Sequence, residues 1–204
     1  MQELSNYPRA FIEAFLRTQV FETGLELNVA DPDIIAGRID TPAQRRKVGY
    51  TDGKTGASVH DSGGETKFGV AQNAHPGVSV RALDLAGAMA IYHKGYWVPV
   101  RAEELSPRVG AYVYDIGCGS GPRWGVRMLQ RALGVADDGV FGPKTMAAAR
   151  AACATKEGET KLLARLLDVR LAFYRSIVAG NPSQKIFLNG WTRRALTYLD
   201  TIKG

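Results

Sequence analysis

Three polar residues in the first part of the chain have the types and the order that cleavage of a glycosidic bond requires: Glu22, Asp61 and Thr66. This reaction uses one carboxyl group that keeps its proton near neutral pH and a second group that handles water or the developing positive charge. Glu22 directly follows Val20 and Phe21, and burial among apolar side chains disfavours the charged form of a carboxyl group. Glu22 is therefore a candidate for the proton donor, and the alternative is an ordinary solvated glutamate at a helix end.

The expected partners of this acid belong to a glycine-rich stretch. Asp61 precedes Gly63 and Gly64, and a polar turn of this kind keeps a carboxylate ionised while glycines let the backbone approach a sugar closely. The Thr66 hydroxyl is expected to hold the water, and His60 is expected to line the cleft beside Asp61. The adjacent carboxylate, Glu65, competes for these roles, although its neighbours offer no apolar pocket.

An amphipathic helix has to present Glu22. Apolar side chains recur at helical spacing from residue 7 to residue 20, at Phe11, Ile12, Phe15, Leu16 and Val20. Asn6 is expected to cap this helix, Pro8 suits its first turn, and Gly24 is expected to end it. Glu22 then lies in the last turn.

The remaining pattern predicts a mainly α fold with a small β or turn-rich region after the first helix. Turn signals make residues 25–60 irregular, and DSGGETKFGVAQ (61–72) predicts a turn or short hairpin. Further helices are predicted at about 80–95, 109–117, 121–134, 143–155, 158–179 and 183–202.

Several single residues have two interpretations. Tyr92, Tyr96 and Trp97 either pack in the core or form a wall on which a sugar stacks. Asp115 stands among aromatic and apolar residues, so it is expected to be buried and to bond helix-end amides rather than to act in catalysis. Trp191 belongs either to a docking helix or to a basic amphipathic end that contacts an anionic envelope.

The turn in ADDGVFGPKT (136–145) is expected to join two helices. Its resemblance to the turn of several peptidoglycan-binding helical modules implies, as the alternative, that it binds wall glycan or peptide. The histidines and cysteines of the chain are His60, His75, His93, Cys118 and Cys153. They lack the spacing of a zinc site. We therefore predict no metal and no cofactor.

Composition limits the class of protein. The 204 residues are 23% charged and 45% hydrophobic, which is typical of a folded domain. No apolar run approaches the ~20 residues of a membrane helix, and the N-terminal residues lack the order of a secretion signal. The net charge of +6 either belongs to a solvated basic face or favours an anionic partner, which could be nucleic acid, a phospholipid surface or an acidic wall polymer. No nucleic-acid motif is present. We expect a soluble monomer without membrane insertion or nucleic-acid binding.

These residues resemble a known family. The helix that ends at Glu22, then DSGGETKFGVA (61–71) and IYHKGYWVPV (91–100), is similar to glycoside hydrolase family 108, the phage endolysin muramidases. YDIGCGSGPRWGVRMLQRALGVADDGVFGPKTMAAA (114–149) and FYRSIVAGNPSQKIFLNGWTRR (173–194) resemble the family-3 peptidoglycan-binding segment.

The resemblance implies a lysozyme-like fold, with a muramidase region at 1–100 and a helical peptidoglycan-binding segment at 101–204, packed as one globular unit. It implies an endolysin that hydrolyses the β-1,4 bond between N-acetylmuramic acid and N-acetylglucosamine in peptidoglycan for host lysis. Such a protein accumulates in the host cytoplasm until a holin-type protein releases it. The implied catalytic residues are Glu22, Asp61 and Thr66. The implied substrate-binding residues are Tyr50, His60, Gly63, Gly64, Tyr96 and Trp97.

One departure from the family pattern concerns the acid. The family's glutamate usually lies directly before a glycine-tyrosine step, whereas residues 25–48 separate Glu22 from Gly49 and Tyr50 in this chain. Lys47, three residues before Tyr50, has no carboxyl group. The acid role is therefore carried to Glu22, with Glu26 as the fallback, and the 25–48 insertion is either a lid or a surface excursion.

Three alternative activities stay open. A lytic transglycosylase would cut the same bond with one acid, and a chitinase-like enzyme would cut chitin oligomers. A non-catalytic wall-binding protein is the third, and the unusual spacing of the glutamate is its best support.

Overall fold

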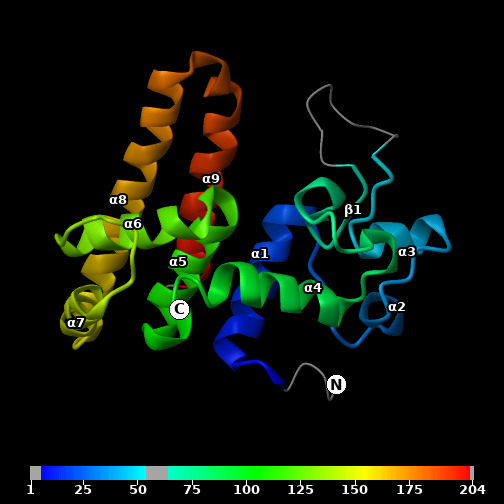
Figure 1. Cartoon of the computed structure of the whole chain (residues 1–204), viewed down its shortest axis with the longest axis horizontal. Helices are drawn as coiled ribbons and strands as arrows, with labels where there is room; N and C mark the ends of the chain where they lie inside the picture. Colours follow the sequence, from blue (N-terminus) through cyan, green and yellow to red (C-terminus); the bar gives the residue numbers. More distant parts are fainter. Residues whose placement is uncertain (1–5, 54–63, 203–204) are drawn as a thin grey trace. The chain divides into compact units, whose positions relative to one another are not determined.

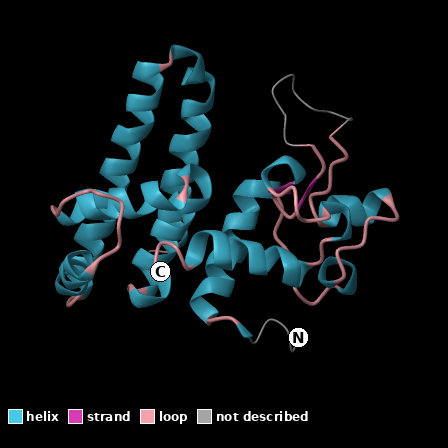
Figure 2. Cartoon of the chain, viewed as in Figure 1, coloured by secondary structure: helices cyan, strands magenta, loops and turns pink. Residues whose placement is uncertain are grey.

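The computed structural model describes residues 6–53 and 64–202 and divides the chain into two compact units, Met1–Tyr92 and His93–Gly204 (Figure 1). Helices dominate both units, and the strands of the described part form one small two-stranded sheet in the first unit (Figure 2). The predicted mainly α class with a small β region is confirmed.

The first helix, α1 (Arg9–Thr23), ends where the sequence predicts. Gly24 adopts the left-handed conformation and its N–H donates to the Val20 carbonyl, which is the usual way glycine ends a helix. The helix begins directly after Pro8, without a side-chain cap, so the cap predicted at Asn6 is wrong. The buried face consists of Phe11, Ala14, Phe15, Thr18 and Gln19.

The segment after α1 is more regular than predicted. Residues 25–48 contain two short helices, α2 (Pro32–Ile35) and α3 (Pro42–Lys47). Asp31 caps the first with its side chain, and Thr41 caps the second through a capping box. Both helices are too short to show a hydrophobic period, so the sequence signals in this segment are those of turns.

The predicted hairpin is present. Strands β1 (Thr66–Lys67) and β2 (Val70–Ala71) pair antiparallel with Thr66 opposite Ala71, and Thr51 forms a further bridge to Thr66. Short helical elements complete the first unit: η2 (Gln72–Ala74), η3 (Val80–Ala82) and α4 (Leu85–Tyr92).

The second unit is a helical assembly around α5 (Pro107–Ser120), whose residues 109–117 are all buried. The predicted helices of this unit are confirmed. Their observed bounds are α6 (Pro122–Leu133), α7 (Pro143–Ala152), α8 (Lys156–Gly180) and α9 (Lys185–Thr201), with short elements η4 (His93–Trp97), η5 (Ala102–Glu104) and η6 (Pro182–Gln184). Helices α8 and α9 pack side by side as a long antiparallel pair (Figure 1).

A buried ionic cluster joins three helices of this unit. Asp115 on α5 accepts a hydrogen bond from Arg170 on α8 at 2.7 Å and from Arg194 on α9 at 2.8 Å. Arg170 also donates to the Tyr174 hydroxyl. Burial raises the pKa of Asp115, but the two guanidinium groups outweigh that effect and hold the pKa below its ordinary value. Asp115 is thus buried as predicted, but the prediction that it bonds helix-end amides is wrong.

The same cluster helps to decide whether α9, which carries Trp191, is a docking helix or a basic amphipathic end. Arg194 is committed to Asp115 inside the unit, and the Trp191 ring packs against Tyr174 with 5.4 Å between ring centroids. These contacts favour the docking-helix interpretation of Trp191 over a basic end that contacts an envelope.

The predicted helix joint at 136–145 is held by one buried glutamine. The side-chain amide of Gln130 donates to Asp138 Oδ1 at 2.8 Å and to Thr145 Oγ1 at 3.1 Å, and its carbonyl oxygen accepts from the Gly139 N–H at 2.8 Å. Every polar atom of this side chain therefore has a partner.

Candidate functional site

Glu22 lies half-buried in the last turn of α1, as predicted. The turn of the β1–β2 hairpin lies directly against it. A Cβ atom at Gly69 would stand 2.8 Å from the Glu22 Cβ and 2.5 Å from the Tyr92 hydroxyl oxygen. Glycine at this position, with φ +74°, is therefore what lets the hairpin turn touch the Glu22 side chain.

The glycine-tyrosine step lies at the same place in spite of the insertion. A Cβ atom at Gly49 would stand 2.9 Å from the Thr23 Cβ. The neighbouring Val48 carbonyl accepts a hydrogen bond from the Phe68 N–H at 2.9 Å. Residues 25–48 thus leave the end of α1 and return to it, and the step contacts both the helix end and the hairpin.

The competing carboxylate, Glu65, is held by two side chains. The Tyr50 hydroxyl donates to Glu65 Oε1 at 2.6 Å, and Arg81 Nε donates to the same oxygen at 3.3 Å. Burial, followed by this hydrogen bond, raises the pKa of Tyr50. The Tyr50 ring is 8% exposed with the guanidinium groups of Arg45 and Arg81 above it, so it leaves little face for the substrate binding predicted for it.

Lys67 is a buried residue of the hairpin that sequence reasoning missed. Its side chain is buried and the ammonium group donates to the backbone carbonyls of Arg81 and Leu83, both at 2.7 Å. Desolvation lowers the pKa of Lys67. The two hydrogen bonds tie β1 to the turn before α4. The sequence signal for a buried lysine was its place in the predicted hairpin, between Thr66 and Phe68.

The remaining predictions around the hairpin have mixed outcomes. Thr66 lies in β1, and its hydroxyl donates to the Gly64 carbonyl at 3.4 Å. A Cβ atom at Gly53 would stand 2.8 Å from the Gly64 carbonyl carbon, so these two backbones are in contact. His60, Asp61 and Gly63 lie outside the described residues.

The predicted aromatic wall separates into different environments. Trp97 is 1% exposed and packs edge-on against Tyr114 at 5.5 Å, so its ring offers no face to a sugar and the packing interpretation holds. Tyr92 is also buried, edge-on to Phe15. Tyr96 remains half-buried.

Gly69→Ala provides a test of the contact with Glu22. Alanine disfavours a left-handed backbone, and its methyl group would overlap the Tyr92 hydroxyl and the Glu22 Cβ. We expect a loss of about 1–3 kcal/mol in the free energy of unfolding, measured by chemical denaturation. Gly77→Ala, where nothing lies within 4 Å of the added atom, serves as the control. Equal stabilities of the two variants would disprove the contact.

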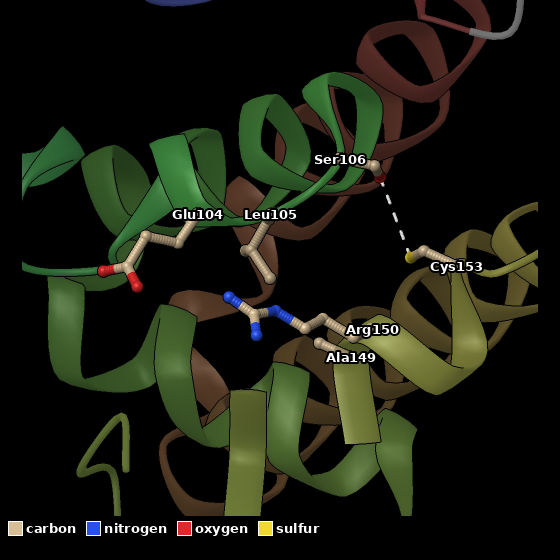
Figure 3. A pocket seen from close by; sticks show the side chains of 6 residues that line it. All are labelled: Glu104, Leu105, Ser106, Ala149, Arg150 and Cys153. Carbon is tan, nitrogen blue, oxygen red and sulfur yellow. Dashed lines mark hydrogen bonds between the residues drawn. The ribbon is translucent and has the colours of Figure 1, made fainter. Parts of the chain in front are cut away.

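The second unit contains a cavity of about 190 Å³ between the start of α5 and α7 (Figure 3). Its lining is Glu104, Leu105, Ser106, Ala149, Arg150 and Cys153. The Cys153 sulfur accepts a hydrogen bond from the Ser106 hydroxyl at 3.7 Å. Burial raises the pKa of the Cys153 thiol, so the sulfur is not activated as a nucleophile.

No group of three or more His, Cys, Asp or Glu side chains within 6–53 and 64–202 is arranged to hold a metal ion. Among the helices of these same ranges, none has the length and apolar character needed to cross a bilayer.

Comparison with known proteins identifies the family of the chain. The family described as Glycosyl hydrolase 108 matches residues 46–121, and the family described as Predicted Peptidoglycan domain matches residues 124–196. No curated protein matches the chain. The solved structure of Brucella abortus SagA is 33% identical, with a TM-score of 0.60, over 75% of this chain and 84% of that chain. The chain therefore belongs to the glycosyl hydrolase 108 family of glycoside hydrolases, and its hydrolase region is followed by a peptidoglycan-domain segment.

Proposed function

We propose that the protein is an N-acetylmuramidase, which hydrolyses the β-1,4 bond between N-acetylmuramic acid and N-acetylglucosamine in peptidoglycan. The observation that carries this proposal is the convergence of Glu22, Gly49 and the Gly69 turn at the end of α1. Gly49 contacts Thr23, the residue after Glu22, so the glycine-tyrosine step lies at the helix end that carries the proposed acid although residues 25–48 separate the two in sequence. Membership of the glycosyl hydrolase 108 family and the peptidoglycan-domain segment support the substrate.

In the proposed mechanism, Glu22 protonates the oxygen that leaves when the glycosidic bond breaks. Asp61 stabilises the oxocarbenium-like transition state or orients water, and the Thr66 hydroxyl holds that water. The contact between the Gly69 turn and the Glu22 Cβ supports this assignment because it places the side chain against the hairpin that carries Thr66. Glu26 is exposed and lies beyond the end of α1, so Glu22 is preferred to it as the acid.

Mass analysis of the products from purified peptidoglycan tests the reaction. Hydrolysis adds one water and leaves a reducing muramic acid end, whereas transglycosylation gives anhydro ends. We expect reducing ends without anhydro products. Anhydro ends would establish the transglycosylase, cleavage of chitin oligomers would establish the chitinase-like enzyme, and wall pull-down without product would establish a binding protein.

The biological role belongs to the same proposal. We infer that the protein is a phage endolysin that accumulates in the host cytoplasm and reaches the wall after a holin-type protein opens the membrane. Expression of the chain alone in a host cell should leave the cell intact, and co-expression with a pore-forming protein should lyse it. Lysis, or appearance of the protein in the periplasm, without the pore protein would contradict this role.

A further inference from the structure

Two polar side chains are buried on the face of α1 that leads to Glu22. Thr18 and Gln19 are both 0% exposed. The Thr18 hydroxyl and both polar atoms of the Gln19 amide have no hydrogen-bond partner in the part of the chain that the structure describes. Burial of an unpaired amide costs free energy of folding, so each such group in a native protein calls for an explanation.

A second buried glutamine, Gln130 in the second unit, provides a comparison for Gln19. Gln130 is 1% exposed, close to the value for Gln19. Its amide donates to Asp138 and Thr145 and accepts from Gly139. The two glutamines thus differ in hydrogen bonding and not in burial. Burial alone therefore does not account for the unpaired state of Gln19.

The helix geometry brings Gln19 and Glu22 together. Residues three apart lie on the same helix face, and helical side chains lean toward the N-terminus, so that Glu22 leans over the turn that contains Thr18 and Gln19. The Thr23 hydroxyl donates to the Gln19 carbonyl at 2.8 Å. The Gly69 backbone lies close to the Glu22 Cβ. This contact limits the positions that the Glu22 carboxyl group can reach.

We propose that Gln19, with Thr18 beside it, is a positioning residue for Glu22, which donates its side-chain N–H to the carboxylate that remains after proton transfer. This inference rests on the proposed function. When Glu22 gives its proton to the leaving oxygen, a negative charge forms on a half-buried carboxyl group. A donor held one turn below stabilises that charge and favours proton transfer. The unpaired amide then costs stability in the resting protein and aids the reaction.

The test compares Gln19→Leu with Gln130→Leu. Leucine has a similar volume and no polar atoms, so Gln19→Leu should raise the melting temperature while Gln130→Leu lowers it. Gln19→Leu should also reduce kcat about tenfold or more and move the alkaline limb of the kcat pH profile upward, because the carboxylate loses a donor. The titratable group that α4 contributes here is the Tyr92 phenol, which lies at the Gly69 turn. Gln19→Met is the second variant, and we expect the same changes in melting temperature, kcat and pH profile.

Each outcome decides the question when Glu22→Gln is assayed in parallel. A Gln19→Leu protein with the wild-type rate and pH profile overturns the positioning role, whatever its melting temperature. A melting temperature that falls in both Gln19 variants also overturns it, because the amide would then support the fold. If Glu22→Gln retains activity, the proposed function itself is wrong. If Glu22→Gln is inactive and Gln19→Leu is unchanged, only the present inference fails.

Discussion

Glu22→Gln is expected to lower the rate of peptidoglycan cleavage about a thousandfold while the protein keeps its fold. Glutamine preserves the size of the side chain and so preserves the contact with the Gly69 turn. It cannot give a proton to the leaving oxygen, and a positioned general acid typically contributes ~10²–10⁴ in rate. The measurement is release of reducing ends from purified peptidoglycan, with circular dichroism and thermal unfolding of the same samples to confirm the fold.

Two further variants make this result specific. Glu26→Gln changes an exposed carboxyl group beyond the helix end and should leave the rate within about twofold, since surface substitutions seldom have larger effects. Glu65→Gln removes the negative charge that accepts from Tyr50 and Arg81, so it should reduce stability as well as activity. An active Glu22→Gln protein together with an inactive Glu26→Gln protein would move the acid role to Glu26.

Asp115→Ala should destabilise the second unit by about 3–5 kcal/mol, because removal of one partner leaves a buried charge without compensation. The carboxyl group is fully buried and pairs with Arg170, which is also fully buried, and with Arg194. Chemical denaturation at pH 7 measures the change in the free energy of unfolding. Asp168→Ala on the exposed side of α8 is the control and should change stability by less than about 0.5 kcal/mol. A small loss for Asp115→Ala would show that the cluster does not support the fold.

The stability that Asp115 contributes has a predictable pH dependence. The two guanidinium groups hold the pKa of Asp115 in the folded protein below its ordinary value. A group of this kind contributes stability above its unfolded pKa, about 3.9, and that contribution is lost as the pH falls through the folded pKa. The difference in unfolding free energy between wild type and Asp115→Asn should therefore be constant near neutral pH and shrink below about pH 4. A difference that grows on acidification would contradict the sign of this shift.

Local sequence patterns determined the elements that carry the site. The apolar spacing before Glu22 and the glycine at position 24 were sufficient to predict α1 and its end, because a helix face and a left-handed cap are both local properties. The glycines of 61–72 were sufficient to predict the hairpin for the same reason. The helices α2 and α3 were not predictable in this way, because one or two turns carry no hydrophobic period.

Only the tertiary structure decided which side chains meet. Asp115 finds its partners 55 and 79 residues further along the chain, and no local pattern distinguishes those arginines from exposed ones. Whether Trp97 packs in the core or faces a sugar depends on what covers the ring, which its neighbours in sequence do not reveal. The return of Gly49 to Thr23 is likewise a result of packing, because residues 25–48 can follow many paths that local spacing does not distinguish. The sequence thus determined the residue types and their local elements, whereas long-range packing determined their contacts.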